Sequence, residues 1–150
     1  AREAAKVLPR IVQQKASLVL DSLAPEARLA ELRLPMQLAE AGVPFCFGGR
    51  PERLRLSAAL AVRNGLDRRT ALAALTRMPA VLLDQQANVG SLRQGTAADF
   101  VVFRGDPLDL DSAFVATWID GVRVSGADAL PPHETANPKS TTAATTAGDR

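Results

Sequence analysis

Side chains that build disulfides and metal clusters are scarce in this sequence. Its 150 residues include one cysteine, Cys46, and one histidine, His133. A single cysteine excludes an internal disulfide and any metal site made from several cysteines. Catalytic zinc is held by several rigidly placed protein ligands, which a lone histidine in a proline-rich stretch does not provide. We therefore expect no metal site within this chain.

Long apolar runs and blocks of a single charge are also missing. No run approaches the ~18 consecutive apolar residues that a membrane span requires, so we expect no membrane partner. The formal net charge is +2, and lysine and arginine are scattered among aspartate and glutamate. Without a basic block, the composition does not favour nucleic acid as a partner.

The size of the chain limits what it forms alone. Its 150 residues suffice for a domain with a core but not for a complete eight-fold barrel, which needs about 250. The sequence begins at Ala1, without methionine and inside a helical pattern, so we interpret it as a piece of a longer polypeptide. A missing targeting signal then says nothing about the compartment, for which cytoplasm is the default. The oligomeric state stays open.

The first 85 residues alternate between helical and strand patterns. Apolar residues at helical spacing predict helices over residues 2–14, 26–41, 54–63 and from the capping residue Asp67 to Leu83. Prolines at positions 9, 35 and 79 are expected to kink or interrupt these helices. Short apolar runs predict buried strands over 17–20 and 43–47. This alternation favours parallel strands joined by helical crossovers.

After about residue 86 the sequence turns to strands and turns. The pair Asp120-Gly121 is typical of a two-residue hairpin turn between strands 114–119 and 122–124. The register that follows pairs Ile119 with Val122, Thr117 with Val124, and Trp118 with Arg123. We expect a mostly apolar face on one side and a cation–π contact between Trp118 and Arg123 on the other.

The strand Phe100–Phe103 carries large apolar side chains on both faces, which predicts that both faces are covered. Before it, Gly95 is expected to supply a positive φ. Asp99 is expected to order the same turn through short-range side-chain hydrogen bonds. Residues 127–150 are rich in proline, threonine and alanine, with few large apolar side chains, and are predicted to be a disordered tail.

Several sequence blocks occur in an order that is informative. They are Leu38–Pro44, Leu56–Leu66, Ala71–Ala80 and Val89–Asp99, followed by Gly105-Asp106-Pro107-Leu108 and the hairpin turn. In this order they resemble the closing segment of the amidohydrolase superfamily, near its imidazolonepropionase-like members. The resemblance covers roughly residues 35–125.

The resemblance implies an α/β fold, namely the C-terminal part of a (β/α)8 TIM-like barrel followed by part of a small β-sandwich. Residues 1–85 would be the last β/α units of the barrel, with strand seven at 17–20 and strand eight at 44–47. Residues 86–126 would be the C-terminal segment of the sandwich. Such a sandwich is normally completed by strands from the N-terminal end, so the expected partner is the remainder of the same polypeptide.

The resemblance also implies a chemistry. Proteins of this superfamily hydrolyse non-peptide C–N bonds, such as those of cyclic amides, with a water activated by zinc, iron or manganese. They place an aspartate after strand eight, in a Gly-Ser/Thr-Asp context. Aligned on Gly48, that position here is Arg50, and a slip of one residue would put Gly49 there. Because a guanidinium stays protonated, it neither accepts a proton nor binds a metal.

We therefore expect no intact catalytic residue and no cofactor or metal ligand in this chain, and a hydrolase-family segment whose site has decayed. The alternative is a non-catalytic binding or assembly module on the same scaffold. If Arg50 points into the barrel mouth, it could bind a small anionic ligand. A solvated loop and helix start is the favoured interpretation of the charged cluster Arg50, Glu52, Arg53 and Arg55. Cys46, between two phenylalanines, is expected to be a small buried hydrophobe.

Overall fold

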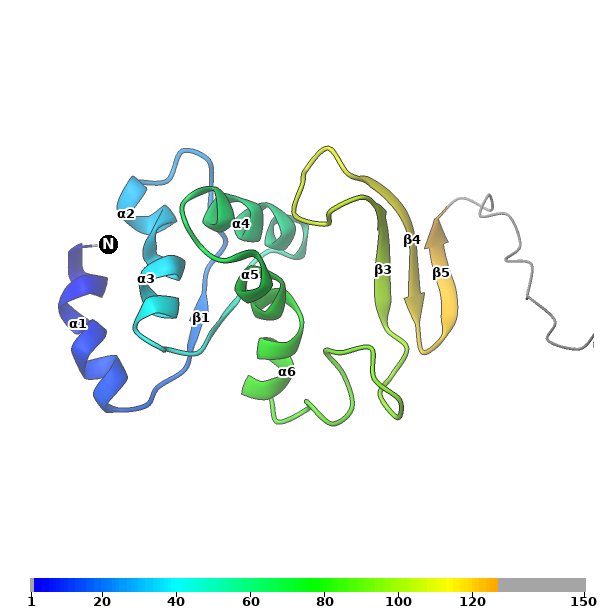
Figure 1. Cartoon of the computed structure of the whole chain (residues 1–150), viewed down its shortest axis with the longest axis horizontal. Helices are drawn as coiled ribbons and strands as arrows, with labels where there is room; N and C mark the ends of the chain where they lie inside the picture. The colour runs from blue at the N-terminus through cyan, green and yellow to red at the C-terminus, as the bar shows by residue number, and fades with distance from the viewer. Residues whose placement is uncertain (1, 127–150) are drawn as a thin grey trace, which may run out of the picture.

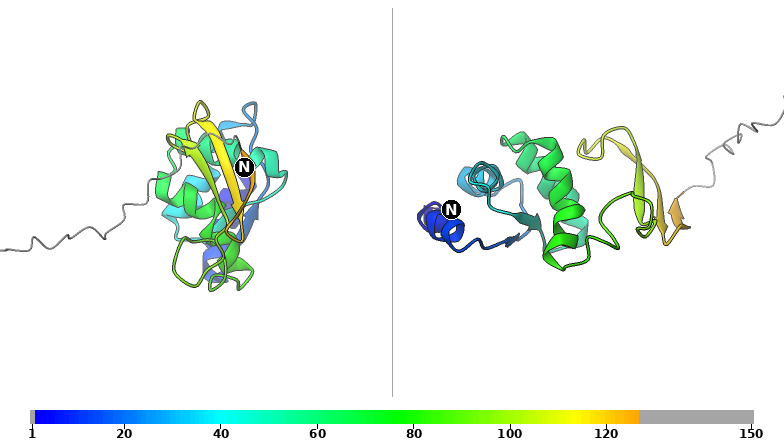
Figure 2. Two further views of the ribbon diagram at one scale, coloured as in Figure 1. Left: turned by 90° about the vertical axis from the view of Figure 1, so that its right-hand side faces the viewer. Right: turned by 60° about the horizontal axis from the view of Figure 1, so that its bottom comes forward.

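The molecule is drawn out along one axis, with helix α1 at one end and strand β5 at the other (Figure 1). This computed structural model describes residues 2–126. The predicted tail over 127–150, with His133, lies outside the described residues. Helices and a small parallel strand pair form one part, and a separate antiparallel sheet forms the other (Figure 2).

The first part alternates helices and strands, as the sequence predicts. Its elements are α1 (Arg2–Gln13), β1 (Leu18–Leu20), α2 (Leu29–Leu32), α3 (Leu34–Glu40), β2 (Phe45–Phe47), α4 (Pro51–Arg63), α5 (Arg68–Leu75) and α6 (Arg77–Leu82). β1 and β2 pair in parallel, with Val19 opposite Cys46. The two predicted strands and their parallel arrangement are therefore confirmed, but the predicted burial holds only for β2, because Val19 of β1 is 66% exposed within residues 2–126.

The core of this part forms around β2. Phe45 and Phe47 are 3% and 4% exposed and meet edge to face. Small residues of the covering helices let the backbones approach the strand, because Ala58 and Ala61 of α4 and Ala71 of α5 have no exposed surface. Burial of these apolar groups is the main driving force for this packing.

Prolines set several helix boundaries, though not always where the sequence suggests. The helix predicted over 26–41 is two short helices, α2 and α3, that meet at Arg33. Pro35 occupies the first turn of α3, where its missing N–H costs nothing. The break predicted at Pro79 comes earlier, at Thr76. A proline ring blocks the carbonyl four residues before it, so α5 ends at Leu75 and Pro79 lies inside α6.

The second part is the antiparallel sheet β3 (Phe100–Arg104), β4 (Ala113–Ile119) and β5 (Val122–Gly126). Asp120 and Gly121 both have positive φ, 50° and 76°, as a type I′ hairpin turn requires. The predicted pairs Ile119–Val122 and Trp118–Arg123 are confirmed, and the Arg123 guanidinium lies 5.9 Å from the Trp118 ring centre. The pair Thr117–Val124 is wrong: a bulge between Thr117 and Trp118 pairs Thr117 with Ser125.

Two expectations for β3 change as well. Val101 is 50% exposed, so one face of the strand is not covered by residues 2–126. Asp99 does not order the turn before its own strand. Its Oδ1 accepts a hydrogen bond from the backbone N–H of Asp120 at 2.6 Å, across 21 residues of sequence, and so ties β3 to the hairpin turn. The positive φ of Gly95 is confirmed at 89°.

Candidate functional site

The carboxyl ends of β1 and β2 meet at one edge, because the strands are parallel. Asp21 and Ser22 follow β1, and Gly48, Gly49 and Arg50 follow β2. The Ser22 hydroxyl donates to the carbonyl of Gly48 at 3.2 Å and accepts from the N–H of Arg50 at 3.1 Å. These bonds join the two strand ends, and we refer to residues 21, 22 and 48–50 as the rim.

Gly49 leaves no space for a side chain in the rim. Its φ is 85°, a left-handed conformation that residues with a Cβ rarely adopt. A Cβ added to it would collide with Asp21 Oδ1 and Ser22 Oγ. A side chain at position 49 would therefore be strained by this φ and would have to displace the side chains of Asp21 and Ser22.

Arg50 lies at the carboxyl end of β2, as the sequence predicts, and is also the N-cap of α4. Its side chain is 74% exposed and lies 4.0 Å from Glu52 Oε1. An ion pair this exposed contributes little to stability, about 0–1 kcal/mol. The side chain does not cap the helix. Arg50 and Glu52 thus form the solvated helix start that the sequence favours.

Asp21 is a carboxylate in the rim that the sequence reasoning missed. Its Oδ1 accepts the backbone N–H of Ser22 at 2.7 Å, and the residue is exposed. The signal was available, because Asp21 follows directly after the strand predicted over 17–20. Only the pairing of β1 with β2 brings it beside Gly49.

The described residues bring together no set of metal ligands. Within 2–126, no group of three or more histidine, cysteine, aspartate or glutamate residues lies close enough to hold a metal ion. Cys46 is buried in β2 with 5% of its surface exposed. Burial raises the pKa of its thiol, because the thiolate is poorly solvated there, so Cys46 contributes packing to β2.

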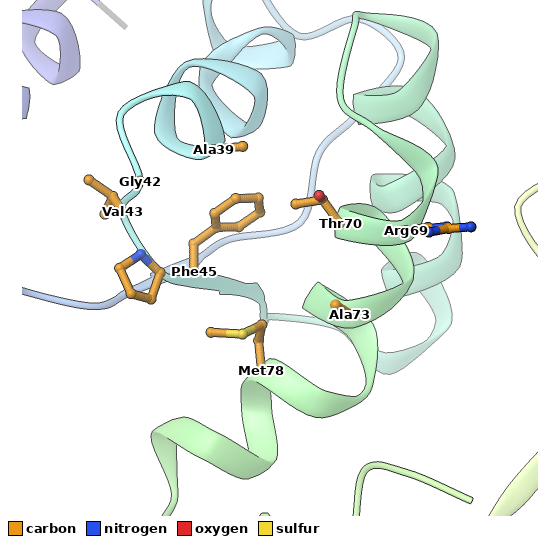
Figure 3. A pocket seen from close by; sticks show the side chains of 9 residues that line it. Ala39, Gly42, Val43, Phe45, Arg69, Thr70, Ala73 and Met78 are labelled. Carbon is orange, nitrogen blue, oxygen red and sulfur yellow. The ribbon is translucent and has the colours of Figure 1, made fainter.

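An apolar cavity of about 490 Å³ lies between α3, α5 and β2 (Figure 3). Phe45, Val43 and Met78 supply its walls. Figure 3 shows the Arg69 side chain directed away from it. The Thr70 hydroxyl is already bonded to Asp67, at 3.1 Å, in the cap of α5. The cavity thus offers apolar surface and no group for acid, base or metal chemistry.

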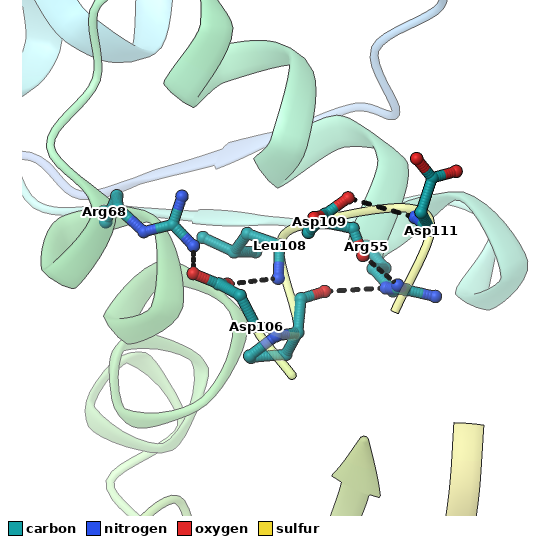
Figure 4. Close-up of polar contacts among 7 residues, drawn as sticks. Arg55, Arg68, Asp106, Leu108, Asp109 and Asp111 are labelled. Carbon is teal, nitrogen blue, oxygen red and sulfur yellow. Dashed lines mark hydrogen bonds and ion pairs between the residues drawn. The ribbon is translucent and has the colours of Figure 1, made fainter. Parts of the chain in front are cut away.

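Arg55 does not belong to the solvated helix start that the sequence favours for its charged cluster, so that expectation is wrong for this residue. Its guanidinium donates to the carbonyls of Pro107 at 2.6 Å and of Asp109 (Figure 4), and to that of Ser112 at 3.1 Å. It also lies 4.4 Å from the centre of the Phe103 ring. The side chain is partly buried rather than solvated, and it joins α4 to the loop between β3 and β4.

The Gly105-Asp106-Pro107-Leu108 sequence makes the other half of this contact. Leu108 is 5% exposed and belongs to the core of the helical part. Asp106 forms an ion pair with Arg68 of α5, and its Oδ1 accepts the N–H of Leu108 at 2.8 Å (Figure 4). The Gly105-Asp106-Pro107-Leu108 motif, which is part of the sequence resemblance, therefore holds the loop between β3 and β4 against the helices.

Comparison with known proteins decides the family. The model of the family described as "Amidohydrolase family" matches residues 50–125, half of the chain. The chain belongs to the amidohydrolase family. This amidohydrolase chain is 41% identical over 66 residues to the amidohydrolase tasK of Hapsidospora irregularis. That match covers 44% of this chain and 7% of the relative.

Solved structures agree on the fold. An amidohydrolase from Thermotoga maritima MSB8 superposes with a TM-score of 0.72 and 28% identity, over 83% of this chain and 35% of its own. A β-aspartyl dipeptidase from Fervidobacterium islandicum AW-1 gives a TM-score of 0.67 over 84% of this chain and 35% of its own; at 16% identity it shares the fold alone. The chain thus spans about a third of these structures.

Membership in this family confirms the resemblance found in the sequence. The family is generally metal-dependent, whereas residues 2–126 show no metal site. The same described residues contain no helix long and apolar enough to cross a membrane.

Proposed function

We propose that this chain is the C-terminal segment of an amidohydrolase-family protein. The ancestral activity of that protein is the hydrolysis of non-peptide C–N bonds, such as those of cyclic amides. Its site has decayed at strand eight. One observation carries the proposal. Arg50, a permanent cation, stands at the carboxyl end of β2, where the family's aspartate is expected. Function depends on such site residues and not on the scaffold that carries them.

In this proposal β1 and β2 are strands seven and eight of a (β/α)8 barrel. Residues 1–85 are its last β/α units, and residues 86–126 are the C-terminal segment of the flanking sandwich. The parallel pairing of β1 with β2 and the similarity to amidohydrolase structures support this assignment. Active groups of barrel enzymes lie at the carboxyl ends of the strands, which is where the rim lies.

The remainder of the same polypeptide is the proposed partner. Val19 on β1 is 66% exposed, and Leu92 and Val122 are 74% and 65% exposed. The first solved relative is much longer, since the match covers 83% of this chain but 35% of that structure. Barrel strands preceding β1 would bury Val19. Further strands of the sandwich would cover the antiparallel sheet β3–β5.

The rim does not fit the divalent metal that the family generally uses. The guanidinium of Arg50 would repel a cation, and Gly49 has no side chain that could bind one. Asp21 is a single carboxylate with one oxygen already bonded to the Ser22 N–H. We therefore assign no reaction step to a metal at this rim.

A non-catalytic binding or assembly module is the second candidate. Its support is the Arg50 side chain, 74% exposed beside the rim and 4.0 Å from its Glu52 neighbour. A small anion with a carboxylate or phosphate group would compete with Glu52 for the guanidinium.

Metal analysis of the full-length protein tests the main proposal. The purified protein is expected to carry less than stoichiometric zinc, iron or manganese and to leave cyclic amides intact. Stoichiometric metal that is lost on mutation of an upstream histidine, together with turnover, would contradict a decayed site. Anion binding measured by calorimetry tests the second candidate: Arg50→Asp should abolish it, and Arg53→Asp, at an exposed arginine three residues further along α4, should not.

A further inference from the structure

The hairpin turn between β4 and β5 places an aspartate directly before a glycine. Asp120 has a φ of 50°, a left-handed conformation that few residues other than glycine adopt, and Gly121 follows with a φ of 76°. Because glycine has no side chain, its backbone nitrogen is open to the carboxyl group of the residue before it. The pair Asp120-Gly121 therefore brings together the two groups that react to form isoaspartate.

This reaction of the pair needs no molecule other than water. The Gly121 nitrogen bonds to Cγ of the Asp120 side chain, and the bond from Cγ to its hydroxyl breaks, so that the hydroxyl leaves as water with the proton of the nitrogen. Water then adds to the main-chain carbonyl of Asp120 in the resulting succinimide, and the bond from that carbonyl to the nitrogen breaks. The main chain afterwards runs through the side chain of Asp120 and is longer by a methylene group.

Two hydrogen bonds from the segment that enters β3 hold this turn, and Figure 1 shows the turn beside that segment. Asp99 Oδ1 accepts the N–H of Asp120 at 2.6 Å, and the carbonyl of Ala98 accepts the N–H of Gly121 at 3.1 Å. The bond to Ala98 engages the nitrogen that would react, and the bond to Asp99 fixes the residue that carries the carboxyl group. Both bonds are made by residues of this chain, so they do not depend on the strands that complete the sandwich.

We propose that Asp120-Gly121 is a modification site for isoaspartate, which the Asp99 carboxylate keeps unreactive. A hydrogen bond to a carboxylate is stronger than one between neutral groups, so this contact is the main restraint on the turn. Modification has a structural consequence, because a two-residue turn fits its strands only at its own length. The added methylene group would displace Val122 from its partner Ile119, and β5 would lose its register on β4.

Incubation of the full-length protein at neutral pH tests this proposal. Isoaspartate at position 120 is located by mass-spectrometric fragmentation of the tryptic peptide that spans residues 105–123. In Asp99→Ala it should form at least roughly tenfold faster than in the wild type, because a tenfold larger fraction of open turns corresponds to about 1.4 kcal/mol of lost hydrogen bonding. Asp99→Asn keeps an oxygen acceptor and should give a smaller increase. Asp111→Ala, at an exposed aspartate of the loop between β3 and β4, is the matched control and should leave the rate unchanged.

The pair Asn64-Gly65 in the helical part distinguishes opening of the turn from general unfolding. Asparagine before glycine forms the same succinimide with loss of ammonia, and the fold holds this pair too. Asn64 Nδ2 donates to the carbonyl of Leu60 at 2.8 Å, and the Gly65 N–H donates to that of Val62 at 3.0 Å. Deamidation at Asn64, which changes the mass of its peptide, should therefore keep the wild-type rate in Asp99→Ala. In urea, where the turn is unfolded, both proteins should form isoaspartate equally fast.

Three outcomes would overturn the proposal. The first is that the folded wild type and Asp99→Ala form isoaspartate at the same rate, or that neither forms any. The second is faster deamidation of Asn64 in that variant, because the turn would then open only with the whole molecule. The third is a difference between the two proteins that persists in urea, where the contact of Asp99 with the turn is absent.

Discussion

Arg50 begins α4 without capping it. Its backbone has φ −74° and ψ 124°, the extended conformation that an N-cap requires, but its side chain makes no capping bond. A cation also lies unfavourably at the positive end of a helix dipole. The start of α4 therefore lacks the carboxylate that would stabilise it as a cap.

Arg50→Asp is expected to stabilise the protein by about 1 kcal/mol, because an aspartate there can accept N–H groups of the first turn of α4. Urea unfolding of the full-length protein, followed by circular dichroism, measures the change. Arg50→Ala removes the cation without adding a cap and should give a smaller effect. An aspartate variant no more stable than the alanine variant would contradict the capping argument.

Gly49→Ala should destabilise the protein by about 2 kcal/mol or more, because a Cβ meets Asp21 and Ser22 in addition to the cost of a positive φ. Gly95→Ala is the matched control. Gly95 has a similar φ of 89°, but nothing lies within 4 Å of the added Cβ. The same unfolding measurement compares the two, and equal losses would show that the rim has room.

At the scale of elements, α5 depends on its cap. The Asp67 carboxylate accepts the backbone N–H of Thr70 at 3.0 Å, and this bond is the main cause of its lowered pKa. Because the pKa is lower in the folded state, the ionised cap stabilises the protein at pH values above the unfolded pKa of about 4. That contribution is lost as the pH falls through the lowered pKa.

Asp67→Asn should remove this part of the pH dependence, because asparagine caps without titrating. Stability measured from neutral pH down to about pH 3 should therefore fall less steeply in the variant. Asp84→Asn, a change at an exposed aspartate outside the caps, serves as the control and should keep the steeper fall. Identical slopes for wild type and Asp67→Asn would refute the assignment.

At the scale of the whole molecule, the chain exposes surfaces that globular proteins usually cover. β1 has an unpaired edge within the described residues, with Val19 exposed, and β5 is the outer strand of its sheet. Unpaired edges and exposed apolar side chains favour association. These surfaces are consistent with a segment that spans 35% of its structural relatives.

Residues 1–126 expressed alone are expected to associate or to remain insoluble, and co-expression with the preceding part of the polypeptide should rescue them. Size-exclusion chromatography with light scattering reports the state. A soluble monomer that unfolds in one sharp transition would count against the need for the remainder.

The sequence by itself determined the local elements. Apolar runs gave β1 and β2, Asp120-Gly121 gave the hairpin turn, and Asp67 gave the cap of α5, because each depends on residues close together in the chain. The family and the position of Arg50 were also accessible from residue order alone.

Only the tertiary structure decided which distant groups meet. Arg55 reaches Pro107 across 52 residues of sequence, and Asp99 reaches Asp120 across 21. Asp21 lies beside Gly49 because two strands far apart in sequence pair in parallel. Such partners depend on how whole elements pack, and no local spacing encodes that packing. The contacts of Arg55 with the loop between β3 and β4, and the place of Asp21 in the rim, therefore appear only once the chain is folded.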